Sequence, residues 1–260
     1  ELEESARPEL VHLNHAAYGA LPWRSPAVVA VHGCLLARWL AVKGEAAPPS
    51  WDAHRRATAA GLRRARAVAA ASRSLLGSLE MFYGWHAPGR VIPYGREPAE
   101  YTPAPKEPFV YCAGDLADAA LNAAALEEVA REIAWPVYIR GAAAPSSGGA
   151  ALLGELPWEE HRRWLARAAV FARPARYDPF GIAVLDAALS GCALVLGDIP
   201  SLAEVWGDAA LYVPAGDRRA LRQALRRLIQ DPALRRRLGL AARERALSYS
   251  SRRMLAGYLD

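Results

Sequence analysis

The sequence predicts an α/β fold in which parallel strands alternate with helices. Three observations support this fold class. Short apolar runs of strand length alternate with stretches of helical periodicity, a proline-rich break interrupts the chain near position 100, and an Asp/Pro/Gly loop joins a strand to a helix near position 178. Strands that alternate with helices of this length form a parallel sheet covered on both faces.

In the first part of the chain, four short strands are expected, at 10–13, 28–31, 68–71 and 90–93. Residues 51–83 otherwise have a helical pattern, with Arg on one face and Ala, Leu and Val on the other. Ser72 is of a residue type that caps helix N-termini, so a new helix is expected to begin there.

The proline-rich break at 94–108 predicts a linker. The domain boundaries are therefore expected at 1–95 for the first domain, 96–108 for the linker and 109–260 for the second domain. In the second domain, strands are expected at 109–113, 137–140, 151–153, 170–174, 193–196 and 210–213. Helices are expected near 122–133 and at 158–168, 181–189 and 201–206, and two Arg-rich helices should finish the chain.

Composition is that of an ordinary globular protein, with 53% hydrophobic and 23% charged residues. Arg, Gly or Pro breaks the apolar runs before any is long enough to span a membrane. The opening Glu-Leu-Glu-Glu has the wrong charge for a secretory signal. The three cysteines, Cys34, Cys112 and Cys192, are far apart and suggest neither a disulfide nor a metal site, so a cytoplasmic location is expected.

The net charge of +5 is unevenly distributed, because Arg is clustered at 55–66 and at 218–245. One interpretation is that these are solvated helix faces. The other is a patch for anionic lipid, which would place the protein in peripheral contact with the inner face of a membrane. Nucleic acid is disfavoured as a partner, since the sequence has no recognition motif and no aromatic residues interleaved with the basic runs.

The most informative stretch is RYDPFGIAVLDAALSG at 176–191. A loop with Asp178 follows a strand, and a helix is expected to begin near Gly181. A helix N-terminus at the carboxyl end of a parallel strand offers backbone N–H groups and a positive dipole end to a phosphate. Gly181 allows a ligand to approach the backbone, and Asp186 lies about one and a half turns further on, within reach of ribose hydroxyls.

This stretch resembles the signature of glycosyltransferase family 4, in which Glu-Pro-Phe-Gly precedes a second Glu, a run of small residues and a Gly. Here the sequence is Asp-Pro-Phe-Gly at 178–181 with Asp186 as the second acid, and both acids are one methylene shorter than Glu. The runs at 197–204, 212–217 and 91–95 also match the family.

The resemblance implies a GT-B type fold, with two Rossmann-like domains and parallel sheets, of which the first domain is truncated. It also implies a retaining hexosyltransferase that needs no metal and no cofactor. The donor would be a nucleotide-diphosphate sugar, and the acceptor would be an unidentified hydroxyl.

The resemblance further assigns roles to residues of the signature. Asp178 would act in catalysis by contacting hydroxyls of the donor sugar. The backbone of Phe180, Gly181 and Ile182 would hold the diphosphate, and Asp186 would hold the ribose. The alternative for the two acids is structural, with Asp178 as a helix N-cap and Asp186 as a solvated helix residue.

Four more residues are assigned in the same way. Gly114 follows the first strand of the second domain and belongs to the donor site, and Arg140 and Gly154 lie at strand ends where the base would sit. His32 resembles the active-site His of the first domain and is expected near the transferred sugar. The alternative for His32 is a hydrogen-bonded histidine at a strand end.

Two positions depart from the family in a way that affects the chemistry. The family has an Arg and a Lys that neutralise the donor diphosphate, but Asp115 and Leu121 stand at those places. An acid beside a diphosphate is repulsive by about a few kcal/mol. Arg140, Arg173 and Arg176 are the candidates for a replacement cation.

The first domain is expected to be incomplete, because about four strands are found where five or more are needed, and roughly 60–100 residues look absent. The strand at 10–13 would then present an open sheet edge, which a second chain or a second copy should cover. A non-catalytic binding or scaffold subunit is the alternative function. A dehydrogenase-like protein is a weaker alternative, since no Gly-x-Gly-x-x-Gly turn follows a strand.

Overall fold

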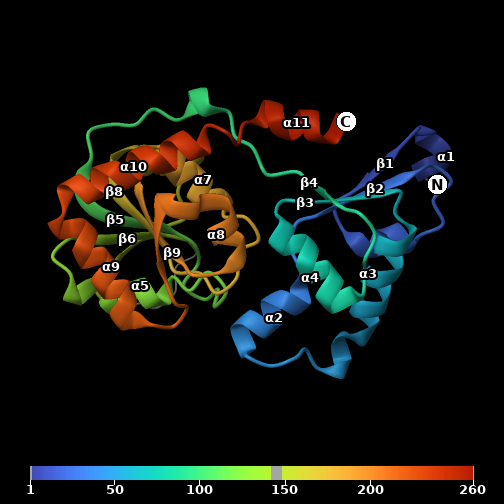
Figure 1. Cartoon of the computed structure of the whole chain (residues 1–260), viewed down its shortest axis with the longest axis horizontal. Helices are drawn as coiled ribbons and strands as arrows, with labels where there is room; N and C mark the ends of the chain where they lie inside the picture. Colours follow the sequence, from blue (N-terminus) through green and yellow to red (C-terminus); the bar gives the residue numbers. More distant parts are fainter. Residues whose placement is uncertain (1, 142–147, 260) are drawn as a thin grey trace. The chain divides into compact units, whose positions relative to one another are not determined.

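The computed structural model describes residues 2–141 and 148–259, and it divides into two compact units between Pro93 and Tyr94 (Figure 1). Each unit has its own parallel sheet, as the sequence predicts. The segment predicted as a linker, 96–108, is part of the second unit, and its Tyr101 is 3% exposed. Regular structure in this segment is limited to the 3₁₀ turn η3 (Pro98–Glu100) and the first residues of β5 (Glu107–Ala113), but the prolines do not prevent side chains of the segment from packing.

The first unit contains a four-stranded parallel sheet in the order β1-β2-β3-β4. Its strands are β1 (Val11–Leu13), β2 (Ala27–Val31), β3 (Ala67–Ala70) and β4 (Arg90–Val91). Its helices are α1 (Leu2–Ala6), α2 (Leu35–Lys43), α3 (Asp52–Arg64) and α4 (Arg73–Tyr83), with short 3₁₀ turns η1 (Ala16–Ala20) and η2 (Pro49–Trp51).

The core of the first unit forms where alternate residues of β2 and β3 meet α2, α3 and α4. Ser72 caps α4 as predicted, since its Oγ accepts a hydrogen bond of 3.1 Å from the amide of Leu75. The sequence analysis missed α2, a nine-residue helix that ends at Gly44 in the left-handed region. Strand β1 lies at one edge of the described sheet, and a partner that covers it stays a prediction.

The second unit contains a six-stranded parallel sheet in the order β10-β9-β8-β5-β6-β7. The strands are β5 (Glu107–Ala113), β6 (Val137–Arg140), β7 (Ala151–Gly154), β8 (Ala168–Arg173), β9 (Ala193–Gly197) and β10 (Ala210–Val213). The chain builds outward from β5 to β7, then returns to pair β8 with the other side of β5. The strand order therefore reverses between β5 and β8, which is where parallel α/β sheets bind their ligands.

Helices cover both faces of this sheet (Figure 1). Val110 and Cys112 of β5 belong to a core shared with α5 and α9, while Tyr111 points to the opposite face and stacks on Trp164 of α6. The helices are α5 (Ala124–Val129), α6 (Trp158–Arg167), α7 (Ile182–Leu189), α8 (Pro200–Trp206), α9 (Arg218–Gln230), α10 (Pro232–Ala246) and α11 (Ser251–Leu259), with 3₁₀ turns η3 (Pro98–Glu100), η4 (Ala130–Glu132) and η5 (Gly207–Ala209).

Most expected elements of the second unit are found, with two differences. The helix expected near 122–133 is short, because α5 ends at Val129 and continues only as a 3₁₀ turn. A third helix, α11, follows the two Arg-rich helices and was not predicted. The three cysteines are buried free thiols, and none of the described helices is long and apolar enough to span a membrane.

A close backbone approach fixes the loop that follows β8. Gly197 ends β9, and a Cβ at this position would lie 2.0 Å from the carbonyl oxygen of Ala175. Real Cβ atoms never come this close, so the loop reaches its position only because residue 197 has no side chain.

We therefore expect Gly197→Ala to lower the free energy of unfolding by about 1–3 kcal/mol, as overpacking of a filled interior does. Urea denaturation followed by circular dichroism measures this. Gly77→Ala is the control, because Gly77 lies in α4 with no atom within 4 Å of the added Cβ. That change should stabilise the protein by about 0.5–1 kcal/mol, and equal effects of the two substitutions would contradict the steric argument.

Candidate functional site

A pocket of about 300 Å³ lies within the second unit, at the carboxyl ends of β5, β6 and β8. This is the edge where the strand order reverses. Four of the residues assigned from the sequence line it, namely Gly114, Arg140, Ile182 and Asp186. The pocket thus brings together residues from three strand ends and the first turns of α7.

Asp186 is a buried acid of this pocket that two side chains bind. Its side chain is buried on α7, with the residue 3% exposed, so the solvated alternative is wrong. Oδ1 accepts hydrogen bonds from Nε of Arg96 at 2.7 Å and from the hydroxyl of Tyr101 at 2.6 Å, and Oδ2 accepts from Nη2 of Arg96 at 3.3 Å. Burial and the adjoining carboxylate raise the pKa of Tyr101, so its hydroxyl keeps the proton that it donates.

The sequence analysis missed both partners of Asp186. Arg96 and Tyr101 lie in the proline-rich segment that was predicted as a linker, and Arg96 is 90 positions away from the acid that it binds. The guanidinium of Arg96 also lies over the ring of Trp158, at 5.6 Å from the ring centroid. A side chain that can both pair with an acid and stack on an aromatic ring is typical of arginine, but no local pattern reveals such distant partners.

Asp178 is also buried, at 7% exposure, and its carboxylate is fully engaged. Oδ2 accepts from Nη2 and Nε of Arg173 at 3.0 and 3.2 Å. Oδ1 accepts from the amides of Gly181 at 2.6 Å and of Phe180 at 3.3 Å. The structure therefore favours a structural role for Asp178, but not as the helix N-cap: Gly181 is the N-cap of α7, and Asp178 accepts from the amides of the turn that precedes the helix.

This arrangement corrects the expectation for the amides of Phe180 and Gly181. Both were predicted to hold a diphosphate, but both donate to Asp178 instead. The physical reason is local, because an Asp side chain readily accepts from the amides two and three residues further on. The ring of Phe180 is 1% exposed and packs edge-on against Tyr94 and Tyr249.

Arg140 is the cation of the pocket that remains available to a ligand. It ends β6, and its buried Nε has no hydrogen-bond partner among the described residues. Arg173 is committed to Asp178 and to the carbonyl oxygen of Ala113, while Arg176 does not line the pocket. Of the three cations considered from the sequence, Arg140 is therefore the one placed to meet an anion.

The backbone around Arg140 ties three strand ends together. The amide of Gly114 donates to the carbonyl oxygen of Arg140 at 2.8 Å, and the amide of Gly141 donates to the carbonyl oxygen of Gly154 at 3.1 Å. Gly154 has a φ of 68°, a conformation that favours glycine. Gly154 itself does not line the pocket, but the next residue, Glu155, does.

Acidic and basic side chains balance in the lining. Arg96, Arg140 and Arg173 face three acids, of which Asp115 and Glu155 were not assigned to binding. Leu121 lines the pocket as well, so both positions at which the sequence departs from the family are part of it. No group of three or more His, Cys, Asp or Glu side chains that could hold a metal ion occurs in the described part of the chain.

His161 is a pocket residue that the sequence analysis also missed. It lies on α6 at 2% exposure, and its Nδ1 is 2.8 Å from the hydroxyl of Tyr111. Burial, with a contribution from the charge of Arg140, lowers the pKa of His161 to about 4. The ring is therefore neutral at pH 7, and it can accept or donate one hydrogen bond without bringing charge into the pocket.

His32 belongs to the first unit and directly follows β2. It is exposed, and its Nε2 lies 2.9 Å from Oδ1 of Asn14. Partial desolvation and the nearby His12 lower the pKa of His32. The alternative of a hydrogen-bonded histidine at a strand end describes these contacts, and a catalytic role stays a prediction.

The comparisons with known proteins find similarity to glycosyltransferases in the second half of the chain. The family model for glycosyl transferases group 1 matches residues 147–245, a stretch that includes Asp186. Glycogen synthase from Mycobacterium tuberculosis (strain CDC 1551 / Oshkosh) is 35% identical over 98 residues, 37% of this chain and 24% of that protein. O-antigen chain mannosyltransferase B from Escherichia coli is 31% identical over 104 residues, 40% of this chain and 26% of that protein. The matched stretch thus spans about a quarter of the length of these relatives.

Solved structures resemble the chain over nearly its whole length. Sucrose-phosphate synthase from Thermosynechococcus elongatus has a TM-score of 0.85 at 19% identity, over 99% of this chain and 74% of that chain. Anabaena HepE, solved in complex with UDP, has a TM-score of 0.82 at 16% identity, over 99% and 80%. At these identities the likeness establishes the fold, which is the GT-B type with two Rossmann-like domains, as predicted.

The buried pair of Arg173 and Asp178 leads to a prediction about stability. Arg173→Ala leaves a buried carboxylate without its cation, so we expect the free energy of unfolding to fall by about 3–5 kcal/mol. Chemical denaturation measures this loss. Arg167→Ala is the matched control, because it breaks an exposed pair with Glu107 and should change stability little. Similar losses for the two variants would show that Arg173 does not compensate a buried charge.

The lowered pKa of His161 leads to a prediction about pH. The unfolded histidine has the ordinary pKa of 6.5 and the folded one about 4, so between these values the unfolded state binds a proton that the folded state does not. Stability should therefore fall as the pH is lowered from 7 to 5, by on the order of 2 kcal/mol from His161 alone.

His161→Gln should remove that part of the pH dependence, whereas His86→Gln, a change at an exposed histidine, should leave it in place. Urea denaturation of the unchanged protein and the two variants at pH 5, 6 and 7 gives the slope of the free energy of unfolding against pH for each. An unchanged slope in His161→Gln would exclude His161 as its source.

Proposed function

We propose that this chain is a glycosyltransferase of family 4 that moves a hexosyl unit from a nucleotide-diphosphate sugar to an acceptor hydroxyl, with retention and without a metal. The observation that supports it is the pocket at the strand reversal, where Arg140 and the buried Asp186 line one cavity. Asp186 lies inside the stretch that matches the family model for glycosyl transferases group 1.

In this proposal the diphosphate of the donor lies against Arg140. At 4 Å and an effective dielectric near 20, a cation and a unit anion attract by about 4 kcal/mol. Ile182 and Ala183, in the first turn of α7, also line the pocket, so the positive end of that helix faces the same ligand. These groups would stabilise the charge that develops on the leaving diphosphate.

The ribose of the donor would bind Asp186. A carboxylate has about four acceptor positions, and Arg96 and Tyr101 use three of them. A ribose diol therefore requires Arg96 to release at least one of its two bonds. Arg96 would then carry its charge toward the diphosphate. This positive charge would replace the two cations that the family has, and this chain lacks, at positions 115 and 121.

The remaining assigned residues enter the proposal in different ways. Asp178 acts through Arg173, which it orients, since its own oxygens are engaged. Gly114 lines the donor pocket, and Arg140 and Gly154 end the two strands near which the base would bind. For His32 we keep the catalytic role that the family resemblance implies; its lowered pKa favours the neutral imidazole at pH 7.

One observation favours a second candidate, a non-catalytic subunit that binds a ligand in the same pocket. The three arginines of the lining are matched by three acids, so the pocket has little net charge with which to hold a diphosphate. If this candidate is correct, nucleotide-diphosphate sugars bind weakly or remain intact.

Calorimetric titration with UDP, GDP and ADP and with the corresponding nucleotide sugars tests the proposed function. At least one of them should bind, and Arg140→Ala should weaken that binding 10-fold or more. Asp115→Arg should tighten it about 10-fold, since a repulsive charge becomes an attractive one; a 10-fold change equals about 1.4 kcal/mol. Arg176→Ala is the matched control and should leave the affinity unchanged, because Arg176 does not line the pocket.

An unchanged affinity in both Arg140→Ala and Asp115→Arg would exclude this pocket as the diphosphate site. Chromatography that detects free sugar released from the bound donor then distinguishes the active transferase from the non-catalytic subunit. Binding without any hydrolysis or transfer would support the non-catalytic subunit.

A further inference from the structure

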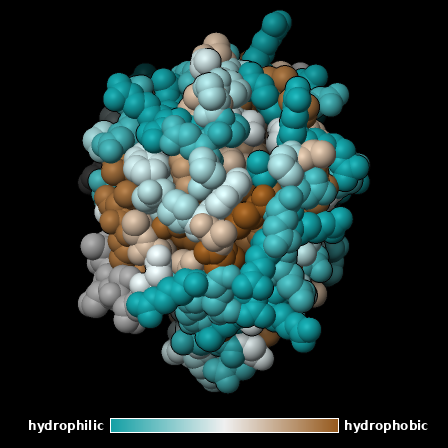
Figure 2. All heavy atoms as spheres, turned by 90° about the vertical axis from the view of Figure 1, so that its left-hand side faces the viewer, coloured by the Kyte–Doolittle hydropathy of each residue, from teal (hydrophilic) through white to brown (hydrophobic). Residues whose placement is uncertain are grey.

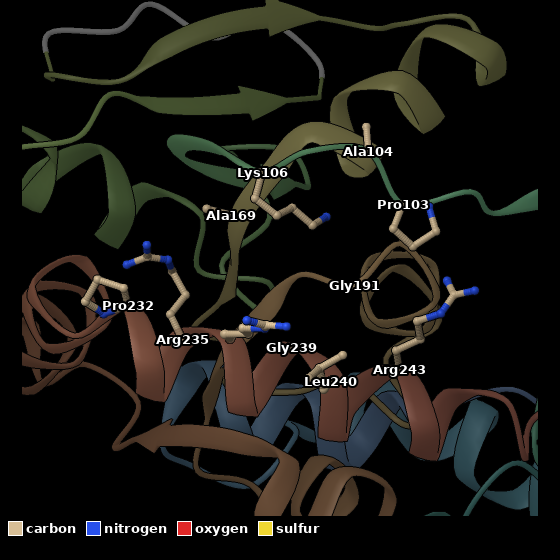
Figure 3. Close-up of a pocket in the computed structure, with 11 residues that line it drawn as sticks. Pro103, Ala104, Lys106, Ala169, Gly191, Pro232, Arg235, Gly239, Leu240 and Arg243 are labelled. Carbon is tan, nitrogen blue, oxygen red and sulfur yellow. The ribbon is translucent and has the colours of Figure 1, made fainter.

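A second and larger cavity of about 600 Å³ lies in the second unit, between the segment 103–106 and α10 (Figure 3). Lys106 precedes β5, Ala169 belongs to the start of β8 and Gly191 precedes β9. These are the amino ends of the strands. The cavity is therefore at the opposite edge of the sheet from the donor pocket, and none of its lining residues takes part in the proposed transfer.

The floor of this cavity is largely apolar. Pro103, Ala169 and Leu240 contribute to it, and Leu240 on α10 is 60% exposed although it is a large hydrophobic residue. The volume is within the range of sites that bind one small molecule, roughly 300–1,000 Å³. Figure 2 shows the side of the molecule on which α9 and the first half of α10 lie, where apolar side chains form a band between hydrophilic ones.

Four cations surround the apolar floor, and none of the described residues that line it is acidic; the cations are Lys106, Arg235, Arg236 and Arg243. Lys106 donates from Nζ to the carbonyl oxygens of Ser190 at 2.6 Å and Ala166 at 2.8 Å. Arg243 donates to the carbonyl oxygen of Leu189. These acceptors are neutral, so they hold the cations in place without cancelling their charge.

The geometry of α10 places a cation beside an apolar side chain. Arg236 and Leu240 are four residues apart and so lie on one face of the helix, and both are exposed. Burial is the main cause that lowers the pKa of Lys106; the neighbouring Cys192 acts in the opposite direction, and the charge of Arg243 adds a small further lowering.

We propose that this cavity binds an anionic amphiphile, a molecule in which a phosphate or carboxylate head is joined to an apolar body. The apolar body would occupy the floor next to Leu240, and the head would meet Arg236 and Arg243 at the rim. A neutral hydrophobic ligand would leave the cations without a counter-charge. A simple anion would leave the apolar floor exposed to water.

Calorimetric titration with three probes tests this inference. The first is dihexanoyl phosphatidic acid below its micellar concentration, the second is dihexanoyl phosphatidylcholine, which has the same chains and no net charge, and the third is inorganic phosphate. The first should bind at least 10-fold more tightly than either of the others, and added salt should weaken it. Equal affinity for phosphate or for the phosphatidylcholine would overturn the proposal.

Variants on α10 locate the site. Arg236→Ala and Leu240→Gln should each weaken binding of the phosphatidic acid 5-fold or more. Arg237→Ala is the matched control, because Arg237 is the adjacent exposed arginine of α10 and does not line the cavity. Circular dichroism and the melting temperature show whether each variant folds, and the two substitutions test the head and the body separately.

An equal loss in Arg237→Ala and Arg236→Ala would indicate non-specific surface charge and contradict the inference. Binding to phosphatidylglycerol vesicles without binding to the monomeric phosphatidic acid would also contradict the inference. That result would indicate that the protein binds a membrane surface and has no site for a single amphiphile. Arg140→Ala should retain full binding of the phosphatidic acid, so a failure of the donor assignment is distinguishable from a failure here.

Discussion

The buried ion pair between Arg173 and Asp178 is the interaction on which the arrangement of the second unit depends. Arg173 ends β8 and also donates to the carbonyl oxygen of Ala113 at the end of β5. Asp178 accepts from the amide of Gly181 at the start of α7, and its own carbonyl oxygen accepts from the hydroxyl of Ser201 in α8. Two residues, through their side chains and one backbone carbonyl, thus connect two strands and two helices at the edge of the sheet where the pocket lies.

A second charged pair gives the pocket its electrostatic character. Arg96 and Asp186 are both committed to each other, so neither contributes net charge as long as the pair is closed. The ligand-binding capacity of the pocket then rests on Arg140, which has no such partner among the described residues. The negative charges of Asp115 and Glu155 oppose the positive charge of Arg140. The pocket is therefore of mixed charge and is not positive throughout.

The sequence predicts the regular part of this fold well and the contacts of its site less well. The ends of β6 and β10 and the cap at Ser72 agree with expectation, because hydrophobic periodicity and local hydrogen bonding determine them. Arg96 and Tyr101 were missed, because the acid that they bind is 85 or more positions away. The sequence left two roles open for Asp178, because an acid in such a loop can contact a ligand or accept from its own backbone, and the structure shows the second kind of contact.

The strand order of the second unit shows that the stretch matching the family model is only part of a sheet. The stretch that matches the family model begins at residue 147 and so contains β7 to β10, but it lacks β5 and β6. Strand β5 lies between β8 and β6 in the middle of the sheet. The matched stretch is therefore a unit of sequence similarity that is not a unit of folding. Expressed alone, it would leave β7 without a neighbour and one edge of β8 open, and the acid of the pocket would face water without its arginine.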